Sequence, residues 1–258
     1  MTSMPALTVQ PNDRVTFGIA HQDEHLLIVE KPARLVTTPG KAHEADSLLN
    51  GLFARFGTRL QSLGAKRDFG LLHRLDKDTS GLVVVALTAP AYDRLREAFE
   101  EREVGKYYWA VTRAAPSRPT GIVKRPIAEQ TVRLDRYRTV KLAKISGAGK
   151  PAATAYRVLE VSPRGALIEA RAITGRLHQV RVHLDAVGAT VLGDDTYGPE
   201  AVRKAAPRLA LHAHRLTLDH PETGERLDVR TRWPRDLRNL LSRLGLSRPD
   251  AAETGGGL

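Results

Sequence analysis

Short apolar runs bounded by turn residues constrain this 258-residue chain most strongly. They include HLLIVEKP (25–32), GLVVVAL (81–87) and KYYWAVT (106–112). Runs of this length that are rich in β-branched or aromatic residues are typical of strands. Each is far shorter than the ~18 apolar residues of a membrane-spanning helix. Helical patterns lie between the runs without regular alternation, which predicts a mixed α+β fold with a largely antiparallel central sheet flanked by helices and loops.

Two hairpins and four helices complete the predicted pattern. The hairpins pair 154–161 with 166–173 and 208–220 with 226–231. The spacing of apolar residues and the positions of capping residues predict helices over 46–57, 90–105, 175–188 and 234–246. We expect Ser47 and Thr174 to cap two of these helices, and Gly57, Gly105 and Gly188 to end three of them. Residues 58–70 are expected to form a loop.

No Pro- or Gly-rich linker divides the chain, so we expect one domain over 21–245, an irregular leader over 1–20 and a flexible tail over 246–258. The N-terminus lacks a basic start followed by an apolar core, so no signal peptide is visible. The chain contains no Cys, which excludes disulfides, thiolate nucleophiles and Cys-ligated zinc. These features predict a cytoplasmic protein.

The charge balance favours a polyanionic partner. Lys and Arg total 40 against 29 Asp and Glu, a net charge of +11, and 30 of the 40 are Arg. The planar guanidinium suits phosphate and base edges, so nucleic acid is the leading partner. A basic, well-solvated surface is the alternative. Aromatic residues make up only 5% of the chain, too few for RNA binding mainly by base stacking.

Three common types of site fit poorly. GAGKP (147–151) resembles the end of a phosphate loop, but Pro151 stands where Ser or Thr would hold magnesium, which indicates a turn. HAH (212–214) places two His on one strand face, but no third metal ligand is evident, so structural roles are favoured. The chain has no glycine-rich dinucleotide fingerprint.

The segment HRLDKDTSG (73–81) places carboxylates in a turn that precedes a buried strand. Aspartyl phosphotransferases use Asp-x-Asp-x-Thr, which Asp76, Asp78 and Ser80 almost match. In that class the apolar strand precedes the Asp pair, whereas here it follows, so this interpretation is disfavoured. A turn carboxylate that bonds nearby amides is the simpler alternative and suits Asp78 and Thr79.

The same segment, continued as HRLDKDTSGLVVVA, resembles the signature of the RluA-type pseudouridine synthases. Five further blocks resemble motifs of that family in the same order: LLIVEKPARLVTTPG (26–40), KYYWAV (106–111), GKPAATAYRVLE (149–160), TGRLHQVRVHLDAVGATVLGDDTYG (174–198), and LALHAHRL with HPETGE (209–225). Six blocks in order are far more specific than one. The resemblance implies the pseudouridine synthase catalytic fold, with an active-site cleft across the sheet.

The resemblance also implies site residues. Asp76 matches the catalytic aspartate, Tyr108 the tyrosine that packs on the flipped uracil, and Arg181 the basic residue that pairs with the aspartate. The matching motifs supply six substrate-binding candidates: Arg74, His73, Thr79, Arg176, His178 and Gln179. Leu177 departs from the family's usual Thr, and we expect altered packing on the apolar face of a helix but no loss of activity. Core packing is the alternative for Tyr108, and a surface pair with Asp185 is the alternative for Arg181.

The implied function is isomerisation of uridine to pseudouridine in ribosomal or transfer RNA, without a cofactor or metal. About 20 residues precede the first expected strand, too few for the small N-terminal RNA-binding domain that some relatives carry. We therefore expect a catalytic domain that holds RNA through basic residues in 58–70 and 121–150, and a monomer without an obligate protein partner. A non-catalytic RNA-binding or ribosome-assembly protein on the same fold is the alternative.

Overall fold

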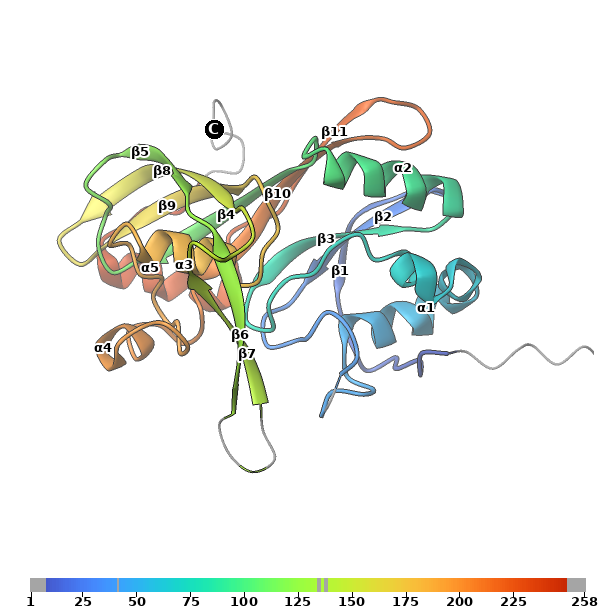
Figure 1. The fold of residues 1–258 in the computed structure, drawn as a ribbon, viewed down its shortest axis with the longest axis horizontal. Coiled ribbons are helices and arrows are strands. Elements are labelled where there is room, and N and C mark those ends of the chain that lie inside the picture. The colour runs from blue at the N-terminus through green and yellow to red at the C-terminus, as the bar shows by residue number, and fades with distance from the viewer. Residues whose placement is uncertain (1–7, 41, 134–135, 137–138, 250–258) are drawn as a thin grey trace, which may run out of the picture. The chain divides into compact units, whose positions relative to one another are not determined.

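The computed structural model describes residues 8–40, 42–133, 136 and 139–249. The chain divides into two compact units (Figure 1). The first unit comprises Met1–Val104 with Arg215–Thr231, and the second comprises Gly105–His214 with Arg232–Leu258. Within the described residues, no helix is long and apolar enough to cross a membrane.

The first unit is built on antiparallel strands. Its elements are β1 (Gly18–Gln22), β2 (Leu26–Lys31), α1 (Leu48–Leu63), the 3-10 helix η1 (Ala65–Gly70), β3 (Ser80–Ala86), α2 (Ala89–Glu100) and β11 (Arg226–Arg230). Strand β2 pairs with both β1 and β3. The Arg215–Asp219 part of β10 (Leu211–Asp219) pairs with β11. Alternate apolar residues of β2 and β3 pack against Tyr92 and Leu95 of α2.

The second unit carries an antiparallel sheet in the order β4-β9-β8-β5. Its elements are β4 (Gly105–Thr112), β5 (Thr120–Lys124), β6 (Ile127–Arg133), β7 (Thr139–Ile145), β8 (Ala153–Ser162), β9 (Gly165–Ala172), α3 (Gln179–Asp185), α4 (Glu200–Arg203), the 3-10 helix η2 (Arg235–Leu237) and α5 (Arg238–Leu244). The remaining part of β10, Leu211–His214, belongs to this unit. The core gathers around Trp109 and includes residues of β4, β9, α3 and α5.

Most predicted elements are confirmed, and so is the mixed α+β class with antiparallel pairing. The predicted hairpins form as β8–β9 and β10–β11, and the segment 147–150 turns as expected. Strand β1 begins at Gly18, inside the segment expected to be irregular. At the other end, Leu246 is buried and the Ser247 N–H donates to Glu160, while the rest of the expected tail from residue 250 lies outside the described residues.

The predicted ends of two helices are wrong. Helix α1 continues through Gly57 to Leu63, because the buried residues Leu60 and Leu63 extend its apolar face. Its start is as predicted, since Ser47 caps it by accepting from the Asn50 N–H. Helix α2 ends at Glu100, five residues before Gly105, which begins β4 instead.

Helix α3 is much shorter than the predicted 175–188. Its N-cap is His178, whose backbone φ of 49° is left-handed and interrupts the helical pattern. Thr174 does not cap the helix, because its hydroxyl bonds the Ala153 N–H and the Gln179 side chain. Leu177 therefore precedes the helix and packs beside a small cluster that includes Ile127 and Val182.

Candidate active site

Asp76 lies in a turn whose backbone is held on both sides. The Thr79 N–H donates to the Asp76 carbonyl over 3.2 Å, which closes the turn. Gly81, the second residue of β3, has a φ of 120°, a conformation that suits glycine. The Asp76 side chain is half-buried and Thr79 is buried. This places a carboxylate at a fixed point beside an exposed surface.

Two side chains from the β2 end anchor this turn. The fully buried Lys31 ammonium donates to the Pro32 and Leu35 carbonyls, and over 3.2 Å to the carbonyl of Lys77. The Thr37 hydroxyl donates to the Leu75 carbonyl over 2.8 Å and accepts the Leu75 N–H over 3.2 Å. The residues immediately before and after Asp76 are therefore tied to the segment after β2 and to the last residue of β2.

The neighbours of Asp76 in the motif have distinct environments. His73 accepts a hydrogen bond from the Val84 N–H at Nε2 and stacks on Phe99 with ring centroids 5.2 Å apart, so its ring helps to hold the turn against β3 and α2. The Arg74 side chain is exposed. The Thr79 hydroxyl is buried and has no hydrogen-bond partner within the described residues. Their substrate contacts stay predictions.

Tyr108 lies on β4, half-buried, opposite Ala170 of β9. It packs beside the Trp109 core, and its expected place against a substrate base stays a prediction. Because side chains alternate along a strand, Tyr108 shares a face with Lys106. Lys106 is 8% exposed, and this burial lowers its pKa to about 8, with a further contribution from Arg171. Sequence reasoning gave Lys106 no role, although the Lys-x-Tyr spacing could have indicated one.

The lowered pKa of Lys106 predicts a specific pH dependence of stability. Between pH ~8 and ~10.4 the unfolded chain binds a proton at this lysine that the folded chain has lost, so the free energy of unfolding rises with pH. We expect this site to contribute up to about 3 kcal/mol over that interval. In urea unfolding, the Lys106→Met variant should not show this rise in the free energy of unfolding with pH. The control variant Lys124→Met, changed at an exposed lysine, should still show it. Equal pH dependence in wild type and Lys106→Met would contradict the prediction.

Arg181 is buried on α3 and binds a carboxylate of the same unit. Its Nε and Nη2 atoms donate to the two oxygens of Asp194 over 2.8 and 2.7 Å, and its guanidinium carbon lies 5.0 Å from the centre of the Tyr197 ring. Asp194 is 1% exposed, and hydrogen bonds from Arg181 and from the Thr196 and Tyr197 N–H groups hold its pKa below the usual range despite burial. The alternative of a surface pair between Arg181 and Asp185 is wrong.

The Arg181–Asp194 pair leaves open whether Arg181 also binds a second carboxylate. A guanidinium carries five N–H donors, so Asp194 does not exhaust its capacity for a second acidic partner. The expected pairing of Arg181 with Asp76 stays a prediction, since these two residues belong to different units. Sequence reasoning missed Asp194 as a partner, although the Gly-Asp-x-x-Tyr-Gly block contains it.

The remaining candidates surround the start of α3. Arg176 is half-buried and donates to the Pro151 carbonyl, and His178 Nδ1 lies 2.7 Å from the Tyr197 hydroxyl. Gln179 is buried, and its amide bonds the Thr174 and Thr154 hydroxyls, the Arg176 N–H and the Ala153 carbonyl. Gln179 thus fixes the loop before α3, and substrate contacts of these three residues stay predictions.

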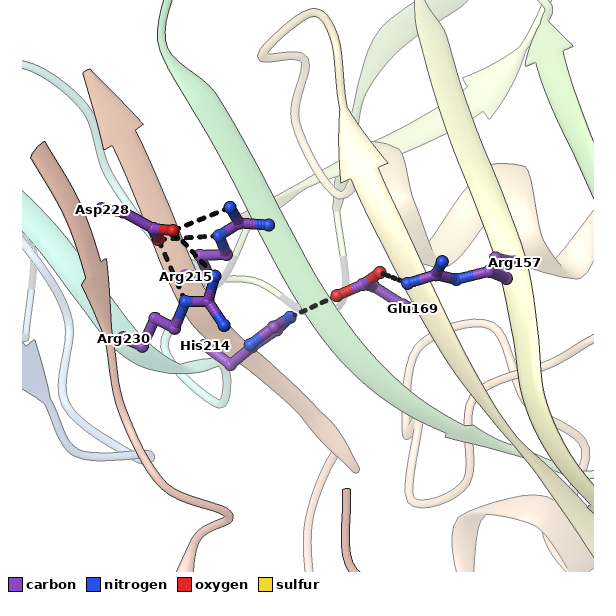
Figure 2. Close-up of polar contacts among 6 residues, drawn as sticks. All are labelled: Arg157, Glu169, His214, Arg215, Asp228 and Arg230. Atoms are coloured by element: carbon purple, nitrogen blue, oxygen red, sulfur yellow. Dashed lines mark hydrogen bonds and ion pairs between the residues drawn. The ribbon is translucent and has the colours of Figure 1, made fainter. Parts of the chain in front are cut away.

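The HAH segment forms a buried structural network. His214 stacks on Trp109 with ring centroids 3.9 Å apart, and its Nε2 lies 3.0 Å from Glu169. Figure 2 shows Glu169 between His214 and Arg157, whose Nη2 donates over 2.8 Å. Burial lowers the pKa of the neighbouring His212 to about 3. No group of His, Asp and Glu side chains suited to a metal occurs in the described part of the chain.

Figure 2 also shows a second ionic cluster, which belongs to the first unit. Asp228 of β11 binds Arg215 over 2.7 and 2.8 Å and Arg230 over 3.1 and 2.7 Å. These arginines hold the pKa of Asp228 well below its usual range. The cluster fastens the β10–β11 hairpin, and the one carboxylate offsets the charge of one of the two arginines.

Comparison with known proteins relates this arrangement to one family. The family model described as RNA pseudouridylate synthase matches residues 25–186. The ribosomal large subunit pseudouridine synthase D of Zymomonas mobilis is 36% identical over 245 residues, which cover 92% of this chain and 75% of the relative. The dual-specificity RNA pseudouridine synthase RluA of Escherichia coli is 39% identical over 211 residues, which cover 80% of this chain and 88% of the relative.

A solved structure agrees in fold. The human RNA pseudouridylate synthase domain containing 4 protein superimposes with a TM-score of 0.68 and 30% sequence identity. The match covers 90% of this chain and 95% of the human chain. The chain therefore shares with the human protein a mixed α+β architecture with a mostly antiparallel central sheet and flanking helices.

Proposed function

Because the chain belongs to the RluA-type RNA pseudouridylate synthases, which are isomerases, we propose that it converts specific uridines of ribosomal or transfer RNA to pseudouridine, with Asp76 as the catalytic carboxylate. The double anchoring of the turn, by Lys31 at Lys77 and by Thr37 at Leu75, is the observation that carries the assignment of Asp76. Enzymes hold reacting groups in fixed geometry in this way.

The reaction requires one bond to break and another to form at the same sugar carbon. The C1′–N1 bond of uridine breaks, the uracil turns, and a C1′–C5 bond forms. The proton on C5 is lost and N1 gains one, so the product is an isomer. Asp76 serves by attacking the sugar or the uracil ring, or by removing a proton from the sugar. Each of these routes uses an ionised carboxylate.

Arg181 and Tyr108 have supporting roles in this proposal. A catalytic carboxylate needs an arginine partner that pairs with its charge and orients it. We propose that Arg181 is this partner, held ready by Asp194. The uridine must leave its stack to reach Asp76, which costs a few kcal/mol. Stacking on Tyr108 and basic contacts to phosphates offset that cost.

The RNA is proposed to lie against basic residues of 58–70 and 121–150. In the first segment Arg67 is bound to Asp93 over two 2.9 Å hydrogen bonds, which leaves Arg59 and Lys66 as exposed cations there. The second segment presents exposed Lys and Arg side chains along β5, β6, β7 and their connections: Lys124, Arg125, Arg133, Arg136, Lys141, Lys144 and Lys150. This segment is therefore the stronger candidate for phosphate contacts.

The proposed function is tested by mapping pseudouridine in cellular RNA with and without this gene. We expect pseudouridine to disappear from one or a few positions of ribosomal or transfer RNA, and purified protein to restore it to the same RNA in vitro. An unchanged pseudouridine map, together with no activity of the purified protein on that RNA, would reject the function.

The anchoring of the turn predicts the effect of Thr37→Val. The change keeps the shape of the side chain but removes the two hydrogen bonds to Leu75. We expect kcat to fall about tenfold or more, because Asp76 loses fixed geometry, and unfolding free energy to fall by about 1–3 kcal/mol. Thr37→Ser keeps the hydroxyl and should retain activity. A kcat unchanged in Thr37→Val would show that this anchor does not position the carboxylate.

A further inference from the structure

The β6–β7 hairpin needs an anchor at its base. It is a two-stranded sheet of its own, and Figure 1 shows it extending away from the other strands of the second unit. An isolated two-stranded hairpin is marginally stable in water. Its exposed cations outnumber its exposed acids, since Arg133, Lys141 and Lys144 stand against Glu129. If RNA binds to this hairpin, the base of the hairpin must therefore be fixed by contacts with the rest of the unit.

Tyr197 supplies part of that anchor. The Ala143 N–H of β7 donates to the Tyr197 hydroxyl over 2.8 Å, and Ala143 is buried. The Tyr197 ring also packs against the small apolar cluster that includes Ile127 of β6, Ala143 of β7 and Val182 of α3. One tyrosine thus contacts the base of the hairpin through both its hydroxyl and its ring.

The same tyrosine contacts the Arg181 assembly in three ways. Its ring lies 5.0 Å from the guanidinium carbon, within the range of a cation–π interaction. Its backbone N–H donates to the Asp194 carboxylate that binds Arg181. Its hydroxyl lies 2.7 Å from Nδ1 of His178, the residue that caps the helix carrying Arg181. Displacement of Tyr197 would therefore disturb Arg181.

We propose that Tyr197 is a positioning residue that couples the β6–β7 hairpin to Arg181. Phosphate contacts on the hairpin fix β7, the Ala143 N–H fixes the Tyr197 hydroxyl, and the ring and backbone of Tyr197 fix the guanidinium and Asp194. RNA bound on the hairpin thereby promotes the reactive arrangement. This inference rests on the proposed function for its effect on catalysis, whereas the coupling itself is tested on the protein without RNA.

Tyr197→Phe separates the hydroxyl from the ring. The variant keeps the aromatic face beside Arg181 and the packing of the cluster, but removes the hydrogen bonds to Ala143 and His178. We expect the rate of amide hydrogen exchange to rise about tenfold in β7 and also in α3. The loss of one hydrogen bond shifts the equilibrium of local opening by about a factor of ten. Tyr92→Phe is the matched control, since it removes a hydroxyl bonded to Asp68 in the other unit. Faster exchange confined to the hairpin would overturn the coupling.

A double-mutant cycle tests the catalytic consequence. The hairpin variant Lys141→Gln/Lys144→Gln should raise KM and lower kcat in the wild-type background, because it weakens RNA contacts that act on Arg181. In the Tyr197→Phe background it should still raise KM but have little further effect on kcat, which is the non-additivity of coupled sites. Additive losses in kcat would overturn the coupling. Absence of activity in the wild-type protein on every RNA would instead reject the proposed function.

Discussion

Asp76→Asn is expected to leave the chain folded and able to bind RNA while abolishing pseudouridine formation. Asn has nearly the same shape as Asp, and the hydrogen bonds that hold the turn are made by the backbone of residues 75–79. These bonds remain when the carboxylate becomes an amide, so we expect the turn to keep its conformation. Catalysis should be lost, because a neutral amide neither attacks the sugar or base nor accepts a proton efficiently at neutral pH.

The measurement is tritium release from RNA labelled at uridine C5, because the proton on C5 is lost when the new carbon–carbon bond forms. RNA affinity and urea unfolding of the same preparation supply the controls, and both should match wild type. Asp78→Asn, two residues away in the same turn, should remain active. Substantial turnover by purified Asp76→Asn would refute the assignment of the catalytic carboxylate.

Arg181→Met is expected to damage both stability and activity, for separable reasons. Removal of the guanidinium leaves the buried Asp194 carboxylate without its ionic partner. A buried charge that loses its partner typically costs about 3–5 kcal/mol. The loss of activity has another expected cause, since Arg181 is proposed to pair with Asp76 and orient it.

The double variant Arg181→Met/Asp194→Asn separates these two effects. The Asp194→Asn change would keep a side-chain oxygen for the Thr196 and Tyr197 N–H groups but remove the charge, so most of the lost stability should return. Activity should not return, because the proposed partner of Asp76 is still missing. Urea unfolding measures the stability, and tritium release the activity, of wild type, the single variant and the double variant. Recovery of activity with stability would show that Arg181 is structural only.

The sequence was sufficient for the strands and for the turn of Asp76, because both depend on local patterns. Alternating or continuous apolar residues locate β2, β3 and β8–β9, and the Gly and Ser residues that follow Asp76 mark the turn. The family motifs then predict site roles for Asp76, Tyr108 and Arg181 together, which local patterns cannot do because these residues are far apart in the chain.

The parts that the sequence could not predict depend on contacts between distant segments. The helical spacing over 175–188 gave no sign that Thr174 and Gln179 bind the β8 backbone and side chains, which commits residues 174–178 to a loop. The bidentate pair of Arg181 with Asp194 spans 13 residues and follows from the path of the chain after α3. Gly57 was misleading because packing of the apolar face outweighs the helix propensity of one residue.

The most direct test of the central claim is an experimental structure of this protein bound to its RNA with the target uridine in place. We expect the Asp76 carboxylate to lie within about 3.5 Å of an Arg181 nitrogen, with the uridine turned out of its stack against Tyr108 and its sugar beside Asp76. A uridine bound elsewhere, or an Asp76 carboxylate without contact to either Arg181 or the nucleotide, would contradict the proposed mechanism.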